Sequence, residues 1–326
     1  MKGLLAAIRG YLSDAWGAWN TFWFSPTDPA TLSMLRLLAG GMLLYTHLIW
    51  SLDLSGFIGP DGYVPVSVLR APQGPDFPAW SAWSVFFWIK STWLLWVVHV
   101  LALVVFACLT VGFFSRTAAL LAFPLAVSYA YRVTPGAFFG LDKVNCMLAL
   151  YLLLGPCGAR YSLDRLWRLR RGDATDPEPS VSANLAVRLL QVHLCIFYLF
   201  SGLPKLDGST WQLGTALWWG ASITEYRSVS LLWLADWPKF AALLTHATVF
   251  WEIFYCCLVW NRFTKPLVLG MAFCVHGGIA LFMGMITFGT AMIIANLSFL
   301  KPETVRKILD PVAGRVSLAL VGKKVS

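Results

Sequence analysis

The feature that most constrains this chain is a succession of apolar runs, most of them as long as a helix that crosses a bilayer. The 326 residues contain eight such runs: 32–50, 85–112, 117–134, 137–155, 185–203, 239–260, 267–284 and 287–300. About 20 apolar residues span a ~30 Å hydrocarbon layer as a helix. Only 13% of the residues are charged, roughly half the share in a soluble domain. The sequence therefore predicts an all-α integral membrane bundle of about eight transmembrane helices.

Both ends of the chain show the pattern of a helix that lies in the membrane interface. In residues 1–24, Leu4, Ile8, Leu12 and Trp16 recur at helical spacing with polar residues between them, which is typical of an amphipathic interfacial helix. Apolar residues recur in the same way within the basic tail 301–326. We expect three parts: the interfacial helix 1–24, a transmembrane domain 25–300 and a cytoplasmic tail 301–326.

The distribution of Lys and Arg predicts the orientation. Five arginines fall in the polar segment 157–184, which we expect to be a solvated loop: Arg160, Arg165, Arg168, Arg170 and Arg171. Loops rich in Lys and Arg lie on the cytoplasmic side, so both termini are predicted to be cytoplasmic in a bacterial-type inner membrane. The same bias explains the net charge of +9 without a nucleic-acid partner.

The sequence gives no pattern for a metal site. The seven cysteines form no CxxC pair, and most of them lie in apolar runs, where a thiol is inert. No two histidines have the i, i+4 spacing of zinc ligands on a helix. We predict no bound metal.

Ionisable residues inside the runs are the candidate functional residues, because a charge in hydrocarbon costs at least ~2.5 kcal/mol. Arg36 and Glu252 have predicted depths of roughly 8 and 12 Å from the inner surface, so we expect a structural ion pair between them. A second set is predicted toward the outer leaflet: His47, Asp142, Lys143, Asn145, Lys205, His246 and His276. Lys205 could act as a base after desolvation, or it could extend to water and pair with Asp207. Each histidine could carry a proton or simply pack between helices.

Three stretches resemble a known family. Asp28-Pro-Ala-Thr-Leu-Ser-Met-Leu-Arg36, Leu141-Asp-Lys-Val-Asn145 and Tyr198-Leu-Phe-Ser-Gly-Leu-Pro-Lys205-Leu-Asp207, followed by Trp211, resemble the horizontally transferred transmembrane (HTTM) domain family. This family includes the membrane portion of vitamin K-dependent gamma-carboxylase. The resemblance extends over residues 25 to 300 and implies a lipid-soluble reduced quinone as cofactor.

The resemblance also implies roles for individual residues. Lys205 falls at the position of the carboxylase lysine that removes a proton from the quinol. Asn145 and His276 fall near polar positions that would stabilise the developing oxyanion. We expect Asp142, Lys143, His47, His246 and Trp211 to line the ring site.

The leading hypothesis is a carboxylase-like or epoxidase-like enzyme in the lipid bilayer. The carboxylase has a large luminal domain after its membrane portion, whereas this chain has only residues 301–326, as in smaller bacterial members of the family. The alternative is a non-catalytic membrane partner for the maturation or export of a peptide. A small-molecule transporter is a third possibility, although no inverted repeat is evident.

Overall fold

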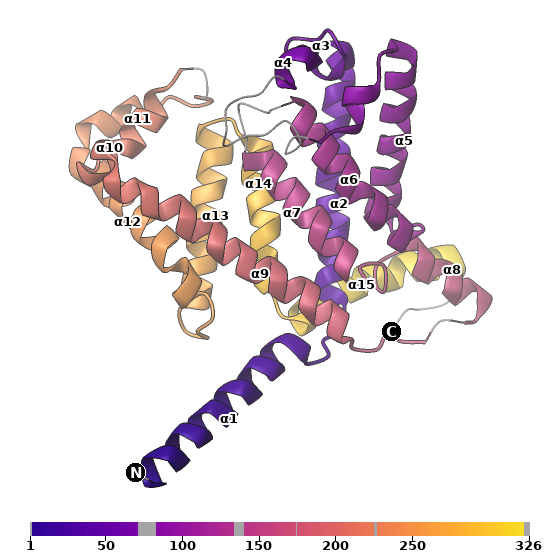
Figure 1. The fold of residues 1–326 in the computed structure, drawn as a ribbon, viewed down its shortest axis with the longest axis horizontal. Coiled ribbons are helices and arrows are strands. Elements are labelled where there is room, and N and C mark those ends of the chain that lie inside the picture. The colour runs from indigo at the N-terminus through magenta and orange to yellow at the C-terminus, as the bar shows by residue number, and fades with distance from the viewer. Residues whose placement is uncertain (1, 71–82, 134–139, 174, 225–226, 323–326) are drawn as a thin grey trace. The chain divides into compact units, whose positions relative to one another are not determined.

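The computed structural model of the chain is all-helical over the residues that it describes, which are 2–70, 83–133, 140–173, 175–224 and 227–322 (Figure 1). These ranges contain no strand beyond one isolated bridge between Thr27 and Ser180. The α-helices, in chain order, are α1 (Lys2–Phe24), α2 (Ala30–Trp50), α3 (Leu54–Ile58), α4 (Val66–Leu69), α5 (Thr92–Val111), α6 (Ser115–Val133), α7 (Gly140–Leu154), α8 (Leu163–Arg171), α9 (Val181–Gly202), α10 (Ser209–Gln212), α11 (Ala216–Ser222), α12 (Pro238–Leu258), α13 (Lys265–Phe282), α14 (Ile286–Asn296) and α15 (Pro302–Val321).

Five helical segments in the described ranges are long and apolar enough to cross a membrane, which confirms a multi-pass membrane protein. They are Ala30–Ile58, Thr92–Val111, Val181–Asp207, Pro238–Leu258 and Lys265–Phe282. Each of them overlaps one of the predicted runs. The predicted count of about eight spans is not confirmed.

The other three predicted spans form helices that meet the requirement less well. Helix α6 has 19 residues but contains Pro124 and two arginines. Helices α7 and α14 have 15 and 11 residues, short of the ~20 that a bilayer requires. The predicted boundary between the runs 117–134 and 137–155 lies outside the described residues.

The chain forms two compact units. Unit 1 comprises residues 1–138, 146–189 and 300–326, and unit 2 comprises 139–145 and 190–299. Helices α7 and α9 therefore contribute residues to both units. Lys205, Glu252, Asn145 and His276 belong to unit 2, whereas Arg36 and His47 belong to unit 1.

In unit 1, α2 and α5 pack closely because Gly40 has no side chain. A Cβ at Gly40 would lie 2.9 Å from the backbone of Thr110, a separation that only glycine allows. Helix α5 then ends at Gly112, whose φ of 71° is left-handed and whose N–H bonds to Leu109 O. This is a common C-terminal cap, and it exposes the last carbonyls of α5 toward α2.

Arg36 of α2 binds those carbonyls. Its side chain is fully buried. It donates from Nη1 to Leu109 O and Thr110 O at 2.8 and 2.7 Å, from Nε to Cys157 O at 3.1 Å, and from Nη2 to Tyr161 O. A guanidinium at the negative end of the α5 dipole is favourable. Arg36 therefore links α2, the end of α5 and the segment that follows α7.

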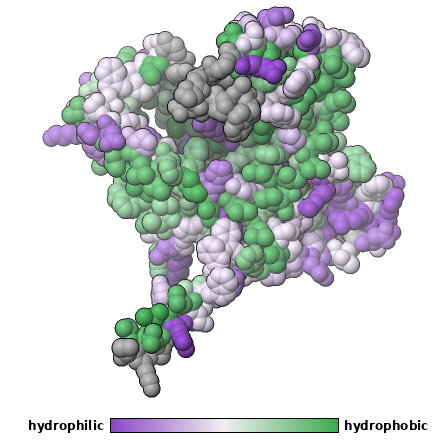
Figure 2. All heavy atoms as spheres, viewed as in Figure 1, coloured by the Kyte–Doolittle hydropathy of each residue, from purple (hydrophilic) through white to green (hydrophobic). Residues whose placement is uncertain are grey.

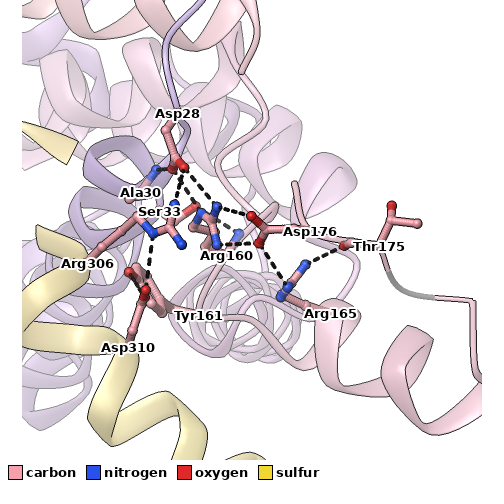
Figure 3. Close-up of polar contacts among 10 residues, drawn as sticks. All are labelled: Asp28, Ala30, Ser33, Arg160, Tyr161, Arg165, Thr175, Asp176, Arg306 and Asp310. Atoms are coloured by element: carbon pink, nitrogen blue, oxygen red, sulfur yellow. Dashed lines mark hydrogen bonds and ion pairs between the residues drawn. The ribbon is translucent and has the colours of Figure 1, made fainter. Parts of the chain in front are cut away.

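The prediction that the arginine-rich segment 157–184 is a solvated loop is only partly correct. Arg160 and Arg165 are buried, with 2% and 5% of their surfaces exposed. Arg160 donates to both oxygens of Asp28 at 2.9 and 2.8 Å, and to both oxygens of Asp176 at 2.9 and 3.2 Å (Figure 3). Arg306 contacts Asp28 at 3.3 Å. Two carboxylates thus neutralise a cation that burial would otherwise destabilise.

The ionisation of these groups follows from the contacts. Burial alone would raise the pKa of Asp176, but the hydrogen bonds and charge of Arg160, with smaller effects from Arg306 and Arg165, outweigh it and hold the pKa below its ordinary value. Burial lowers the pKa of Arg160, and its bonds to Asp28 and Asp176 more than reverse this effect, so that the net shift is upward. Asp176 and Arg160 are therefore both ionised at neutral pH.

The exposed side of α5 is apolar, as expected of a helix that faces lipid. Trp93, Val100, Leu101 and Val104 are between 50% and 74% exposed. Figure 2 shows hydrophobic side chains over the region of α5. Hydrophilic side chains gather instead around α8 in the same view.

Candidate functional site

Lys205 lies in unit 2, in the short 3₁₀ helix Leu203–Asp207 that continues α9. Tyr198, Ser201 and Lys205 are spaced i, i+3 and i+7, so they follow one face of this helical segment. The Lys205 side chain is 18% exposed. Gly202 lets α12 approach here, because a Cβ at Gly202 would lie 3.0 Å from Glu252 Cβ.

The ammonium of Lys205 has three kinds of partner. It forms a short ion pair with Glu252 of α12, donates to Ser201 Oγ at 3.1 Å, and lies 5.0 Å from the centre of the Trp211 ring, within cation–π range. Glu252 is 8% exposed. A lysine and a carboxylate in direct contact, largely shielded from water, can share or exchange a proton.

Two expectations about ion pairs need correction. Lys205 pairs with Glu252 and not with the adjacent Asp207. The ion pair expected between Arg36 and Glu252 is replaced by separate partners, since Arg36 donates to backbone carbonyls and Glu252 accepts from Lys205 and Ser201. Backbone carbonyl oxygens cannot be recognised from residue types, so the estimated depths favoured Glu252, the carboxylate predicted to lie at a depth similar to that of Arg36.

A chain of buried hydrogen bonds ends at His276 of α13. Tyr255 Oη donates to Asn296 Oδ1 at 2.7 Å, and Asn296 Nδ2 donates to Met292 O and to Tyr198 Oη at 2.9 and 2.8 Å. The Tyr198 hydroxyl proton is then directed at His276 Nε2, 2.7 Å away. The contact to the Met292 carbonyl, which can only accept, fixes the orientation of the amide.

The direction of this chain assigns the histidine tautomer. If His276 Nε2 accepts from Tyr198, the proton of the neutral ring resides on Nδ1. His276 is 4% exposed, and Nδ1 has no hydrogen-bond partner in the described part of the chain. His276 thus presents a buried N–H donor without an acceptor.

Asn145 is a second buried polar group without a partner. It lies on the first turns of α7, is 3% exposed, and neither its Oδ1 nor its Nδ2 has a hydrogen-bond partner among the described residues. Leaving such a group unsatisfied costs about 1–3 kcal/mol. A ligand oxygen or a water molecule would recover that energy.

The residues expected to line a ring site are only partly brought together. Trp211 contacts Lys205. His246 is exposed on α12, with Nε2 beside Gly214. Asp142 is half-buried and Lys143 exposed near the start of α7, and both have further interactions. His47 belongs to unit 1, where its Nδ1 bonds to Leu43 O at 2.6 Å and its ring packs 4.4 Å from Phe106.

Sequence reasoning did not select Tyr255 or Asn296 as site residues, and it quoted Tyr198 and Ser201 only within a motif. A signal for two of these was present, because Tyr198 and Ser201 share a helix face with Lys205. Asn296 lies at the end of α14 and bonds to Tyr198 of α9, 98 positions away, so its partner is visible only in the folded chain. No group of three or more His, Cys, Asp or Glu residues in the described ranges could hold a metal ion.

Comparison of the chain with protein-family models, with curated proteins and with solved structures found no match.

Proposed function

We propose that this chain is a membrane-embedded enzyme similar to vitamin K-dependent gamma-carboxylase, acting on a quinol or a similar lipid-soluble ring with Lys205 as general base. The observation that carries the proposal is the contact of Lys205 with Glu252 in a largely buried site of unit 2. The stretch 198–207 resembles the HTTM family, and this resemblance supports the same role for Lys205.

The pair explains how a lysine can serve as a base. Transfer of one proton from Lys205 Nζ to the Glu252 carboxylate leaves a neutral amine and a neutral carboxylic acid. The amine then accepts a hydroxyl proton from the ring, which leaves an oxyanion beside the ammonium. Trp211 and Ser201 hold Nζ in place during both steps.

Two donors fit the developing oxyanion. His276 Nδ1–H and the Asn145 amide are buried and without partners among the described residues, and donors of this kind stabilise negative charge most effectively where water is excluded. A bound quinol would supply the acidic hydroxyl and the electrons for reduction of oxygen.

The test uses purified protein with a naphthoquinol and dioxygen. We expect the wild type to consume quinol and form the epoxide, and Lys205→Ala to lose about 10²–10⁴-fold in rate. Lys239→Ala is the matched control, because Lys239 is an exposed lysine of α12 in the same unit. Equal quinol consumption by wild type and Lys205→Ala, with no epoxide, would refute the assignment.

The second candidate is a non-catalytic membrane partner for the maturation or export of a peptide. The ion pair itself favours this candidate, since a purely structural role, in which Lys205 joins the end of α9 to α12, would also account for the contact with Glu252. Full cellular function of a Lys205→Met strain would support this alternative. Mass spectrometry of lipids extracted from the purified protein separates the two, because only the enzyme requires a copurifying quinone.

The proposed enzyme crosses a bacterial inner membrane about eight times, with α6, α7 and α14 as spans besides the five long ones. Helices α1 and α15 lie in the interface and both termini are cytoplasmic. In support, Leu4, Leu12 and Trp16 of α1 are 66%, 59% and 66% exposed. Cysteine labelling from either side of sealed vesicles at position 4 and at position 320 tests this arrangement.

A further inference from the structure

A cavity of about 240 Å³ opens between four segments of unit 1, and none of the residues proposed for catalysis lines it. Its apolar lining comes from α2, α5, α8 and α15 and includes Leu37, Val111, Leu166, Leu309, Val312 and Val316. Arg165 of α8 also lines it, together with Arg160 and the carboxylate of Asp310. An apolar cleft with a cation in its wall suits a ligand that is apolar along most of its length and anionic at one end.

Arg165 is the polar group of this wall that lacks a full set of partners. It is 5% exposed, its Nη1 donates to Thr175 O at 3.0 Å, and its Nη2 lies 3.5 Å from Asp176 (Figure 3). Its Nε–H is buried and has no acceptor in the described ranges. An anionic oxygen would satisfy this donor.

The carboxylates near the cleft are already engaged. Asp310 accepts from Tyr161 Oη at 2.7 Å and from Arg306 at 3.1 Å, and Asp176 accepts from Arg160. Asp164 accepts from Phe114 N and Ser115 N, both at 2.8 Å. None of these acids is left to neutralise the exposed cations of α8.

Those exposed cations give α8 a surplus of positive charge. Arg168 follows Arg165 by three positions and so lies beside it on the helix, and Arg170 and Arg171 follow. None of the three forms an ion pair with a carboxylate among the described residues. Arg171 lies 4.2 Å from the centre of the Trp167 ring. Arginine beside an exposed Trp is typical of the level of lipid headgroups.

We propose that this cleft holds an acyl chain of an anionic phospholipid, whose phosphate lies against Arg165 and Arg168. A soluble anion needs the arginines but not the apolar walls, and a zwitterionic lipid needs the walls but gains little from the surplus charge. Only an anionic phospholipid uses both. The site is independent of the chemistry proposed for Lys205.

The test is native mass spectrometry of the full chain in detergent, titrated with phosphatidylglycerol, phosphatidylcholine or inorganic phosphate. We expect one tightly bound phosphatidylglycerol and much weaker binding of phosphatidylcholine. Arg165→Gln should weaken phosphatidylglycerol about fivefold, since each cation contributes about one kcal/mol to the attraction of anionic lipid. Arg262→Gln, an exposed arginine of unit 2, should bind as the wild type does.

A second pair of variants tests the cleft without altering charge. Ala313→Trp fills the cavity and should abolish binding, whereas Leu320→Trp, exposed farther along α15, should not change it. Binding of phosphatidylglycerol by Ala313→Trp at wild-type affinity overturns the acyl site. Equal affinity for phosphatidylcholine overturns the headgroup contact, and displacement of the lipid by inorganic phosphate at the same concentration shows a soluble-anion site instead.

Discussion

Replacing Arg36 with Lys tests whether the buried cation of α2 is held by backbone carbonyls. The substitution keeps the charge but replaces a planar fork of donors by a single nitrogen. The four acceptors, Leu109 O, Thr110 O, Cys157 O and Tyr161 O, belong to two different segments. One ammonium cannot reach all of them.

The magnitude follows from counting the acceptors that lose their donor. Leu109 O keeps the N–H of Gly112 at 3.3 Å, so the carbonyls of Thr110, Cys157 and Tyr161 depend on Arg36. A lysine that reaches two acceptors leaves at least one buried carbonyl unsatisfied, at about 1–3 kcal/mol, and the shortened side chain adds a packing defect. We expect Arg36→Lys to lower the free energy of unfolding by about 3 kcal/mol.

The assay is unfolding by SDS titration in mixed micelles, followed by circular dichroism. Arg262→Lys, at an exposed position, should change stability by less than ~0.5 kcal/mol. A double-mutant cycle with Glu252→Gln should be additive within about 0.5 kcal/mol, as expected of sites that share no partner. Wild-type stability of Arg36→Lys, or a coupling energy above ~1 kcal/mol with Glu252, refutes the carbonyl-bound description.

Two further predictions concern unit 1. Gly40→Ala should destabilise the protein by about 1–3 kcal/mol, because the new methyl group meets the backbone of Thr110. The control Gly41→Ala should be neutral or stabilising, because its Cβ would have only an ordinary 3.8 Å contact. Equal melting temperatures of the two variants would contradict this packing. The lowered pKa of Asp176 means that its ion pair with Arg160 stabilises the fold above the pKa of the unfolded carboxyl and is lost as the pH falls through the lower folded value. Wild type should therefore lose its advantage in melting temperature over Asp176→Asn as the pH is lowered from about 5 to about 2, and a difference that stays constant over that range would exclude the linkage.

The apolar runs predicted the spans that hydrophobicity alone decides, as in α5, whereas the spans that are not confirmed are those in which length or polarity conflicts with hydrophobicity. In α6, for example, Arg132 is fully buried yet accommodated by the carbonyls of Ile58 and Val64 at 2.8 and 3.0 Å. The sequence cannot show which backbone carbonyls accept from an arginine, because every residue has one. The same limitation explains why Arg36 was predicted to pair with Glu252.

In the candidate site, the sequence identified several of the residues but not the contacts between them. Lys205 was selected from sequence, and Tyr198 and Ser201 share its helix face, so periodicity could have added them. Glu252 was also selected, but 47 positions separate it from Lys205, and only the close approach of α9 to α12 at Gly202 makes the pair. Sequence can thus nominate the members of a polar cluster while leaving their partners undetermined.

The buried cations differ in what their partners allow them to do. Arg36 and Arg132 donate to carbonyls, and because a guanidinium does not lose its proton in proteins and a carbonyl does not take one, these contacts can only hold segments together. Lys205 is different, since its partner Glu252 is a carboxylate, which can take up a proton. If proton transfer occurs at any of these three sites, it occurs at Lys205 and Glu252. Glu252→Gln should therefore impair turnover of a naphthoquinol even where the fold is retained, whereas Arg36→Lys should impair the fold.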